Sequence, residues 1–346
     1  MAVSDQRSKA IKNNGKADAV LEISGKKINP GEQTEIHLKI ARLPTHTVIN
    51  LPVLVYRAIV PGPTLLLTAG LHGDEINGVE TLRRLIKSGL IRPDAGTVVV
   101  IPVVNIHGFI QNSRRFPDGK DLNRSFPGQK DGSLAGRFAW VLMNDILPTV
   151  DFGIDFHTGG AHKANFPHLR CNLDDPEIAN LAKAFAPPFI VHSKPPDHSF
   201  RKAAAIQGKS ILTFEAGESL RFDELAITEG MNGIHRLMFA KGMRQLPGVP
   251  GSSKILHKSW WNRASYSGLF RAFVKPGDQI RRHQQIGSIS DPFGEVEYPI
   301  KAREKGFVIG LNNLCVVNKG EALIHIGTMD SATKSDQPDS QNQKKG

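Results

Sequence analysis

Four residues with the chemistry of a metal-dependent hydrolase stand in three short segments that span about half of the chain. His72 and Glu75 lie in GLHGDEING, His157 lies in DFHTGG, and Glu215 lies in TFEAGE. Zinc accepts histidine nitrogen and carboxylate oxygen at about 2.0–2.2 Å, and a catalytic site with three protein ligands keeps a fourth position open. Glu215 could take a proton from zinc-bound water and pass it to a leaving amine. The pattern therefore predicts a metallohydrolase with one Zn²⁺ per chain.

Each of these segments begins as an apolar run of strand length and ends in glycine-rich sequence. The polar residue therefore follows the point where the strand stops, and in open α/β sheets ligand sites form at the carboxyl ends of the strands. A lone HxxE is common by chance, and a lone histidine at a strand end is more often structural. Their joint placement favours the zinc site over unrelated structural histidines.

Three carboxylates in these segments leave alternatives open. Burying Glu215 is costly unless it is paired or used, so a salt-bridged structural glutamate is the alternative to a base. Glu218 is the less favoured base, because we expect the chain to have left the sheet there. Asp155 stands two residues before His157 and could orient that ligand, but a solvated or helix-contacting aspartate is equally compatible with the sequence.

Two segments are predicted to be loops that hold the substrate. In NSRRFPDGKDLNRSFPG (112–128), Asn123 and Arg124 offer an amide and a planar guanidinium to a carboxylate. Either Arg114 or Arg115 could polarise the scissile carbonyl. In GGAHKANFPHLR (159–170), Arg170 is a further substrate-binding candidate, while His162 and His168 are expected to be pocket or surface residues. Arg201, in DHSFRKAAA, is a possible second clamp for an anion.

The elements that must position these residues alternate between strand and helix. Apolar runs predict strands at 53–60, 64–70 and 97–105, and helical spacing predicts a helix at 80–90. The same alternation continues to about residue 243. It indicates an α/β fold whose mostly parallel or mixed sheet carries helices on both faces. Residues 1–247 are therefore predicted to form the catalytic domain.

The last hundred residues lack this alternation of strand and helix patterns. After PGVPGSS (248–253), short β-type segments follow one another between PGD, DPFGE and NKGE turns, so residues 254–328 are predicted to form a small all-β domain. Residues 331–346 have almost no apolar side chains and are predicted to be a disordered tail.

Composition narrows the class of protein. The 346 residues carry a formal charge of +11, but the basic residues are scattered, which favours attraction of small anions over nucleic-acid binding. No apolar run approaches the ~18 residues that span a bilayer, and no apolar stretch follows the basic N-terminus, so neither membrane insertion nor secretion is expected. Two cysteines without CxxC spacing fit a cytoplasmic protein. The sequence leaves open whether the chain forms a homo-oligomer.

With these motifs in place, the chain resembles the succinylglutamate desuccinylase/aspartoacylase family through HGDE, DLNRSFPG, DFHTG and FEAGE, over about residues 45–245. The resemblance implies an α/β fold of the zinc carboxypeptidase-like type, zinc ligation by His72, Glu75 and His157, and a general base/acid role for Glu215. It further implies that Arg114 polarises the carbonyl and that Asn123 and Arg124 grip the substrate carboxylate. One departure is that the second substrate arginine of the best-known aspartoacylases falls on Ala205 here, with Arg201 nearest to it.

The C-terminal segment resembles the barrel-sandwich shape of biotinyl and lipoyl domains, mainly through VKPGDQIRRHQQIG. Such carrier domains present a lysine at the tip of the central hairpin, whereas the corresponding DPFGEVEYP contains none. We therefore expect a structural module that shapes substrate entry or dimer contacts.

The leading hypothesis is a zinc-dependent deacylase that hydrolyses the amide of a small anionic N-acyl amino acid. The alternative enzyme is a zinc carboxypeptidase acting on short peptides with the same ligands. A catalytically inactive metal-binding or carrier protein and a nucleic-acid binder are the remaining classes, and the complete set of ligands and base disfavours both.

Overall fold

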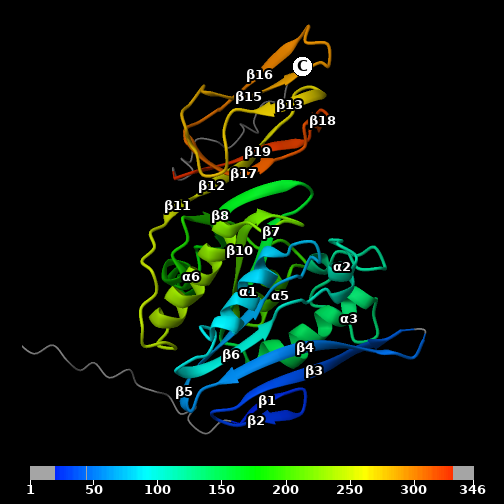
Figure 1. Cartoon of the computed structure of the whole chain (residues 1–346), viewed down its shortest axis with the longest axis vertical. Coiled ribbons are helices and arrows are strands. Elements are labelled where there is room, and N and C mark those ends of the chain that lie inside the picture. Colours follow the sequence, from blue (N-terminus) through cyan, green and yellow to red (C-terminus); the bar gives the residue numbers. More distant parts are fainter. Residues whose placement is uncertain (1–19, 44, 330–346) are drawn as a thin grey trace, which may run out of the picture.

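A large mixed β-sheet runs through the computed structural model, which describes residues 20–43 and 45–329 (Figure 1). Among these residues thirteen strands join it. From edge to edge its main path is β12 (Lys258–Arg263), β19 (Ala322–Thr328), β17 (Gly306–Asn312), β8 (Lys163–Cys171), β10 (Ser210–Glu218), β7 (Phe152–Gly159), β5 (Val60–Thr68), β6 (Ala95–Ile101), β4 (Val48–Arg57) and β3 (Gln33–Arg42). Three short strands extend it: β9 (Phe189–His192) beside β8, β11 (Lys254–Leu256) beside β9, and β14 (Gln279–Ile280) beside β17.

Helices cover both faces of this sheet, as predicted. On one face, apolar residues of α1 (Asn77–Ser88), α4 (Pro176–Phe185) and α6 (Glu224–Ala240) pack against alternate strand residues such as Leu65 and Leu67. On the other, α3 (Leu134–Val141) and α5 (Phe200–Ile206) pack against the residues between them, such as Leu66. The alternation follows from the two-residue period of a strand.

The centre of the sheet places several strand ends together. β6, β5, β7 and β10 are parallel neighbours, whereas β3, β4, β8 and β17 add antiparallel pairs around them. The α/β fold with a mixed sheet is therefore confirmed, and β3 ends the main path of the sheet. The carboxyl ends of β5, β7 and β10 lie at the same edge, from which the predicted site residues project.

Smaller elements complete the first 250 residues. A short helix α2 (Ile106–Ile110) and a 3-10 turn η1 (Leu122–Arg124) follow β6, and a hairpin of β1 (Leu21–Ile23) and β2 (Lys26–Ile28) precedes β3. Helix α3 is followed by a π-helical turn, η2 (Leu142–Ile146), and a 3-10 turn, η3 (Leu147–Thr149). The proline in that last turn cannot supply an amide hydrogen to a continuing α-helix.

Two predictions about local structure are wrong. GGAHKANFPHLR, expected to be a loop, contains β8, which pairs with both β10 and β17. Glu218, expected to lie beyond the sheet, is the last residue of β10, because a register shift after Glu215 lets the strand continue. Polar side chains made both segments look like loops, although β8 is polar mainly where it borders a pocket.

The C-terminal strands continue the main sheet. β17 pairs with β8 at Gly310 and Asn165, and β19 and β12 follow outward. A separate sheet of β16 (Glu297–Lys301), β15 (Gln285–Ser290), β13 (Gly268–Ala272) and β18 (Val316–Val317) packs above them, so the region is antiparallel β (Figure 1). We call residues 254–328 the C-terminal module. Its boundary at PGVPGSS stays a proposal.

An apolar seam joins the C-terminal module to the rest of the molecule. Phe189 and Val191 of β9 pack against Leu256, Phe307 and Ile309. Among the described residues no helix is long and apolar enough to cross a membrane. The predicted tail at 331–346 and the basic N-terminus lie outside the described residues.

Candidate metal centre and pocket

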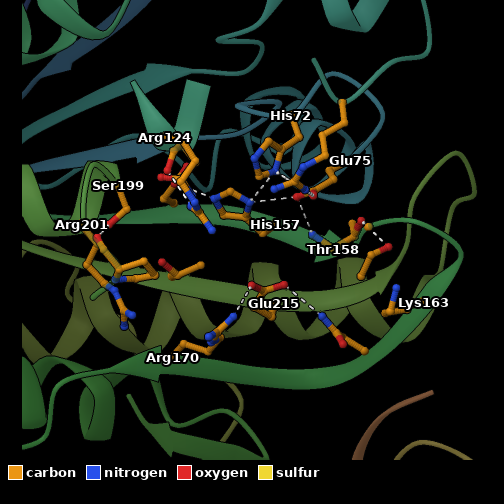
Figure 2. Close-up of a pocket in the computed structure, with 18 of the residues that line it drawn as sticks. His72, Glu75, Arg124, His157, Thr158, Lys163, Arg170, Ser199, Arg201 and Glu215 are labelled. Atoms are coloured by element: carbon orange, nitrogen blue, oxygen red, sulfur yellow. Dashed lines mark hydrogen bonds and ion pairs between the residues drawn. The ribbon is translucent and has the colours of Figure 1, made fainter. Parts of the chain in front are cut away.

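His72, Glu75 and His157 form a buried cluster at the carboxyl edge of the central strands (Figure 2). Their candidate ligand atoms all lie within 4.8 Å of one another. His72 Nδ1 is 2.8 Å from Glu75 Oε1, and His157 Nδ1 is 2.9 Å from Glu75 Oε2. The structure therefore brings together the three residues that the sequence predicted as ligands.

The loop between β5 and α1 fixes two members of the cluster. A backbone hydrogen bond from Glu75 N to His72 O closes the turn. Gly73 in this turn packs directly on α2, where a Cβ would lie 1.9 Å from the carbonyl carbon of Gly108. Only glycine allows that approach. His157 comes from β7 itself, two residues before the end of the strand.

The outer nitrogens of both histidines are held by carboxylates. His72 Nε2 lies 3.1 Å from Asp121 Oδ1, and His157 Nε2 lies 2.7 Å from Asp155 Oδ2. Carboxylates in these positions orient the rings and leave each Nδ1 as the inward donor atom. The two Nδ1 atoms are 3.2 Å apart, close to the ~3.3 Å between two ligands that each lie about 2.0 Å from a tetrahedral zinc ion. The donor set and its spacing fit zinc.

Charge interactions within the cluster are strong because it is buried. Burial lowers the pKa of His157, but the carboxylates of Asp155 and Glu75 outweigh it and hold that pKa well above its usual range. Burial raises the pKa of Glu75, but His72 and His157 outweigh it and bring the value well below its usual range. A divalent cation would compete for the same negative charge and displace the histidine protons.

Arg114 lies beside this cluster, and Arg115 does not. Arg114 Nη1 is 2.9 Å from Glu75 Oε1, and its Nε and Nη2 donate to Asp121 Oδ2. Arg115 is exposed and donates to the carbonyl of Gly119. Of the two arginines that could polarise the scissile carbonyl, Arg114 is therefore the one that lies beside the cluster. Asp121, which joins Arg114 to His72, was missed, although its place in the DLNR motif two residues before Asn123 could have drawn attention to it.

Glu215 faces the cluster from the neighbouring strand. It is paired in register with His157, and paired residues of parallel strands present their side chains on the same face. Its side chain is 12% exposed. Asn165 Nδ2 donates to Glu215 Oε2 at 3.0 Å, and Arg170 Nη1 lies 3.5 Å from Oε1. Two side chains of β8 therefore hold the carboxylate in place, and Arg170, predicted to bind substrate, contacts Glu215.

The remaining predicted substrate residues border the same pocket. Asn123 accepts a hydrogen bond from Phe200 N through Oδ1, and Arg124 is exposed at the rim. Arg201 is buried, and its Nη2 donates to Ser193 Oγ, whereas Nη1 has no hydrogen-bond partner among the described residues. Burial, reinforced by Arg170, lowers the pKa of Arg201 to about 10, so its side chain stays cationic at neutral pH.

These residues enclose a cavity of about 220 Å³. All the predicted site residues line it: His72, Glu75, Arg114, Asn123, Arg124, His157, Arg170, Arg201 and Glu215. Lining residues that the sequence analysis did not single out include Thr158, Gly160, Lys163, Ser199 and, from the C-terminal module, Trp261. His168 lies buried in β8 and His162 is exposed, and neither lines the cavity.

Comparison with known proteins agrees with this arrangement. The model of the succinylglutamate desuccinylase/aspartoacylase catalytic domain matches residues 61–240. The N-alpha-acetyl-L-2,4-diaminobutyric acid deacetylase of Halomonas elongata is 30% identical over 281 residues, which are 76% of this chain and 81% of that protein.

Solved structures share the fold. The product-bound ectoine utilization protein EutE (DoeB) of Ruegeria pomeroyi superposes with a TM-score of 0.77 at 23% identity, over 87% of this chain and 97% of that one. A succinylglutamate desuccinylase/aspartoacylase from Rhodobacter sphaeroides gives 0.74 at 24% identity, over 86% and 95%. With a family model matching more than half of its length, this chain belongs to the succinylglutamate desuccinylase/aspartoacylase family.

Proposed function

We propose that this protein is a zinc-dependent deacylase that hydrolyses the amide bond of a small N-acyl amino acid. The observation that carries the proposal is the position of Glu215, which lies in register with His157 and faces the three candidate ligands across a small cavity. Family membership and the activity named for the Halomonas elongata relative support the same reaction class.

His72, Glu75 and His157 would hold the zinc ion, which when bound supplies a Lewis acid for the carbonyl and lowers the pKa of a water molecule. Glu215 takes a proton from the attacking water as its oxygen bonds to the carbonyl carbon. Arg114 presents a guanidinium to the developing oxyanion. When the C–N bond breaks, Glu215 returns the proton to the leaving nitrogen, so the products are a carboxylate and an amine.

The charges around the cavity support an anionic substrate. Five cationic side chains line it: Arg114, Arg124, Lys163, Arg170 and Arg201. Apart from the ligand Glu75, the carboxylates that line it are Asp155 and Glu215, and each already has a partner. Nη1 of Arg201, which is buried and has no hydrogen-bond partner within residues 20–43 and 45–329, is a candidate donor to a substrate carboxylate. An amine half with a neutral or acidic side chain fits these charges better than the cationic diaminobutyrate named for the relative.

The experiment is to measure primary-amine release from N-acetyl amino acids by the zinc-loaded protein. We expect kcat to fall by about 10²–10⁴-fold in Glu215→Gln with zinc content unchanged, because the proton carrier is lost and the ligands are kept. Glu218→Gln is the matched control, since this residue lies on the same strand but does not line the cavity.

The substrate panel contains N-acetyl derivatives of alanine, aspartate, glutamate and 2,4-diaminobutyrate, together with short dipeptides. A kcat/KM for N-acetyl-diaminobutyrate above that for the neutral and acidic compounds would overturn the charge argument. Cleavage of dipeptides alone would assign the protein to the carboxypeptidases, and full activity in Glu215→Gln would remove that residue from the reaction.

A further inference from the structure

Trp261 reaches the pocket from a strand at the far edge of the sheet. It lies on β12, three strands away from β8, and yet it lines the same cavity as the metal cluster. One row of cross-strand partners connects the two places. Trp261 pairs with His325, His325 pairs with Gly310, and Gly310 pairs with Asn165.

Because residue 310 is a glycine, the Trp261 side chain can extend across β17 to the pocket. A Cβ at this position would lie 3.4 Å from Trp261 Cη2 and 2.8 Å from Asn165 Oδ1. The outer ring of the indole therefore passes over β17 at the one residue of the row without a side chain. It ends near Asn165, whose amide group holds Glu215. The C-terminal module thus touches the residues that position the proposed base.

The indole is held rigidly in that place. It stacks on His325 with ring centroids 4.7 Å apart and an interplanar angle of 11°. Burial, reinforced by His168 and Arg170, lowers the pKa of His325 to about 3, so the supporting ring is uncharged at neutral pH. Lys163 Nζ lies 6.0 Å from the indole centroid, within range of a cation–π interaction. The indole cannot move aside for a longer ligand without losing its stacking contact with His325.

The cavity has two chemically different ends. Arg201 and Ser199 lie at one end in Figure 2, Lys163 lies at the other, and Glu215 lies between them. The carboxylate of an amino acid belongs at the end with Arg201, whose buried Nη1 has no hydrogen-bond partner in the part of the chain that the structure describes. With the amide at Glu215, the acyl group then points toward the end formed by Lys163 and Trp261.

We propose that Trp261 closes the acyl end of the pocket and limits the substrate to short acyl groups such as acetyl. This inference rests on the proposed function, because it assigns the acyl half of that reaction. It identifies a specificity-determining residue that is contributed by the C-terminal module.

The test compares hydrolysis of N-acetyl, N-butanoyl, N-hexanoyl and N-succinyl alanine by the wild-type protein, Trp261→Phe and Trp261→Ala. Each methylene that gains room is worth about a fourfold change in binding, so the hexanoyl-to-acetyl ratio of kcat/KM should rise at least about tenfold in Trp261→Ala. Trp261→Phe should lie between, and it covers the case in which the alanine variant does not fold. Trp260→Phe is the control, because the neighbouring residue packs in the core of the C-terminal module.

A binding measurement separates this inference from the proposed reaction. Dissociation constants for the same compounds are determined by calorimetry in the Glu215→Gln background, where turnover is not needed. If the wild-type protein hydrolyses nothing but Trp261→Ala shifts the chain-length profile of binding, the proposed reaction fails, while Trp261 still limits the length of the acyl group that the pocket binds. An unchanged profile, a change in amine selectivity instead, or a wild-type preference for succinyl over acetyl would overturn the inference.

Discussion

The two walls of the pocket are built in different ways. The first wall contains the candidate metal ligands. His157 lies near the end of β7, and His72 and Glu75 lie in the turn after β5, its parallel neighbour. A second wall, formed by Trp261 and Lys163 at the proposed acyl end, depends on the pairing of four strands from β12 to β8. The first wall is specified by short motifs, whereas the second exists only when distant segments find the correct register. Removing a ligand side chain from the first wall should therefore abolish zinc binding. Removing a side chain from the second wall should instead alter substrate selectivity or the position of Glu215.

The largest effect is expected from His157→Ala, which removes one of three predicted ligands. Zinc content measured by mass spectrometry should fall from about one ion per chain to nearly none, and deacylation should fall with it. His162→Ala is the control, because that histidine is exposed on the same segment. Unchanged zinc content in His157→Ala would disprove the assignment of this ligand.

A smaller effect on the same wall is expected from Asp121→Asn. The carboxylate that orients His72 and pairs with Arg114 becomes a neutral amide. Loss of such a partner typically weakens metal affinity by about 10–100-fold, which competition with a chelator would measure. Asp118→Asn, on an exposed part of the same loop, should have no effect. Equal affinities in the two variants would show that Asp121 does not support the site.

His325, which stacks on Trp261 in the second wall, should make the free energy of unfolding depend on pH. The pKa of His325 is about 3 when folded, against an ordinary value of 6.5. Above pH 6.5 the ring is neutral in both the folded and the unfolded protein, so its titration does not change the free energy of unfolding. Below pH 6.5 only the unfolded chain gains the proton, and stability falls by about 1.4 kcal/mol per pH unit. His325→Phe keeps an aromatic ring under Trp261 and should remove this slope in urea unfolding between pH 6.5 and 4.5. Parallel curves for the two proteins would contradict the prediction.

The smallest effect is expected from Gly310→Ala, at the residue of β17 that lies between Trp261 and Asn165. The added methyl group displaces Asn165 Oδ1 and weakens the support of Glu215. We expect kcat to fall about fivefold, close to the free energy of one hydrogen bond, with zinc content unchanged. Asn165→Ala should give a similar loss, and the double variant should be no worse than either single one. Additive losses would mean that Gly310 acts by another route.

The same contrast explains what could be predicted from the sequence. Strand-end reasoning predicted that His72, Glu75, His157 and Glu215 would meet, and the structure brings them to one cavity, although their roles stay predictions. It also predicted helices on both faces, because the apolar periodicity of each segment reflects the core that it contacts. These are local properties of the chain.

The parts that were missed depend on contacts between distant segments. β8 looked like a loop because the polar residues that line a pocket interrupt its apolar pattern. Trp261 stood out in no motif, because its importance comes from a glycine on another strand. Asp121 lay within a recognised motif, but its hydrogen bond to His72 requires the folded loop.

The uninterrupted pairing of β17 with β8 also bears on how such enzymes could be recombined. A chimera that exchanges residues 254–328 with the corresponding segment of a relative would change the acyl wall while leaving every predicted metal ligand in place. The graft must include β17 itself, because its Gly310 decides whether an aromatic ring can cross it. The acyl preference would then be transferred with residues 254–328, independently of the residues that break the amide bond.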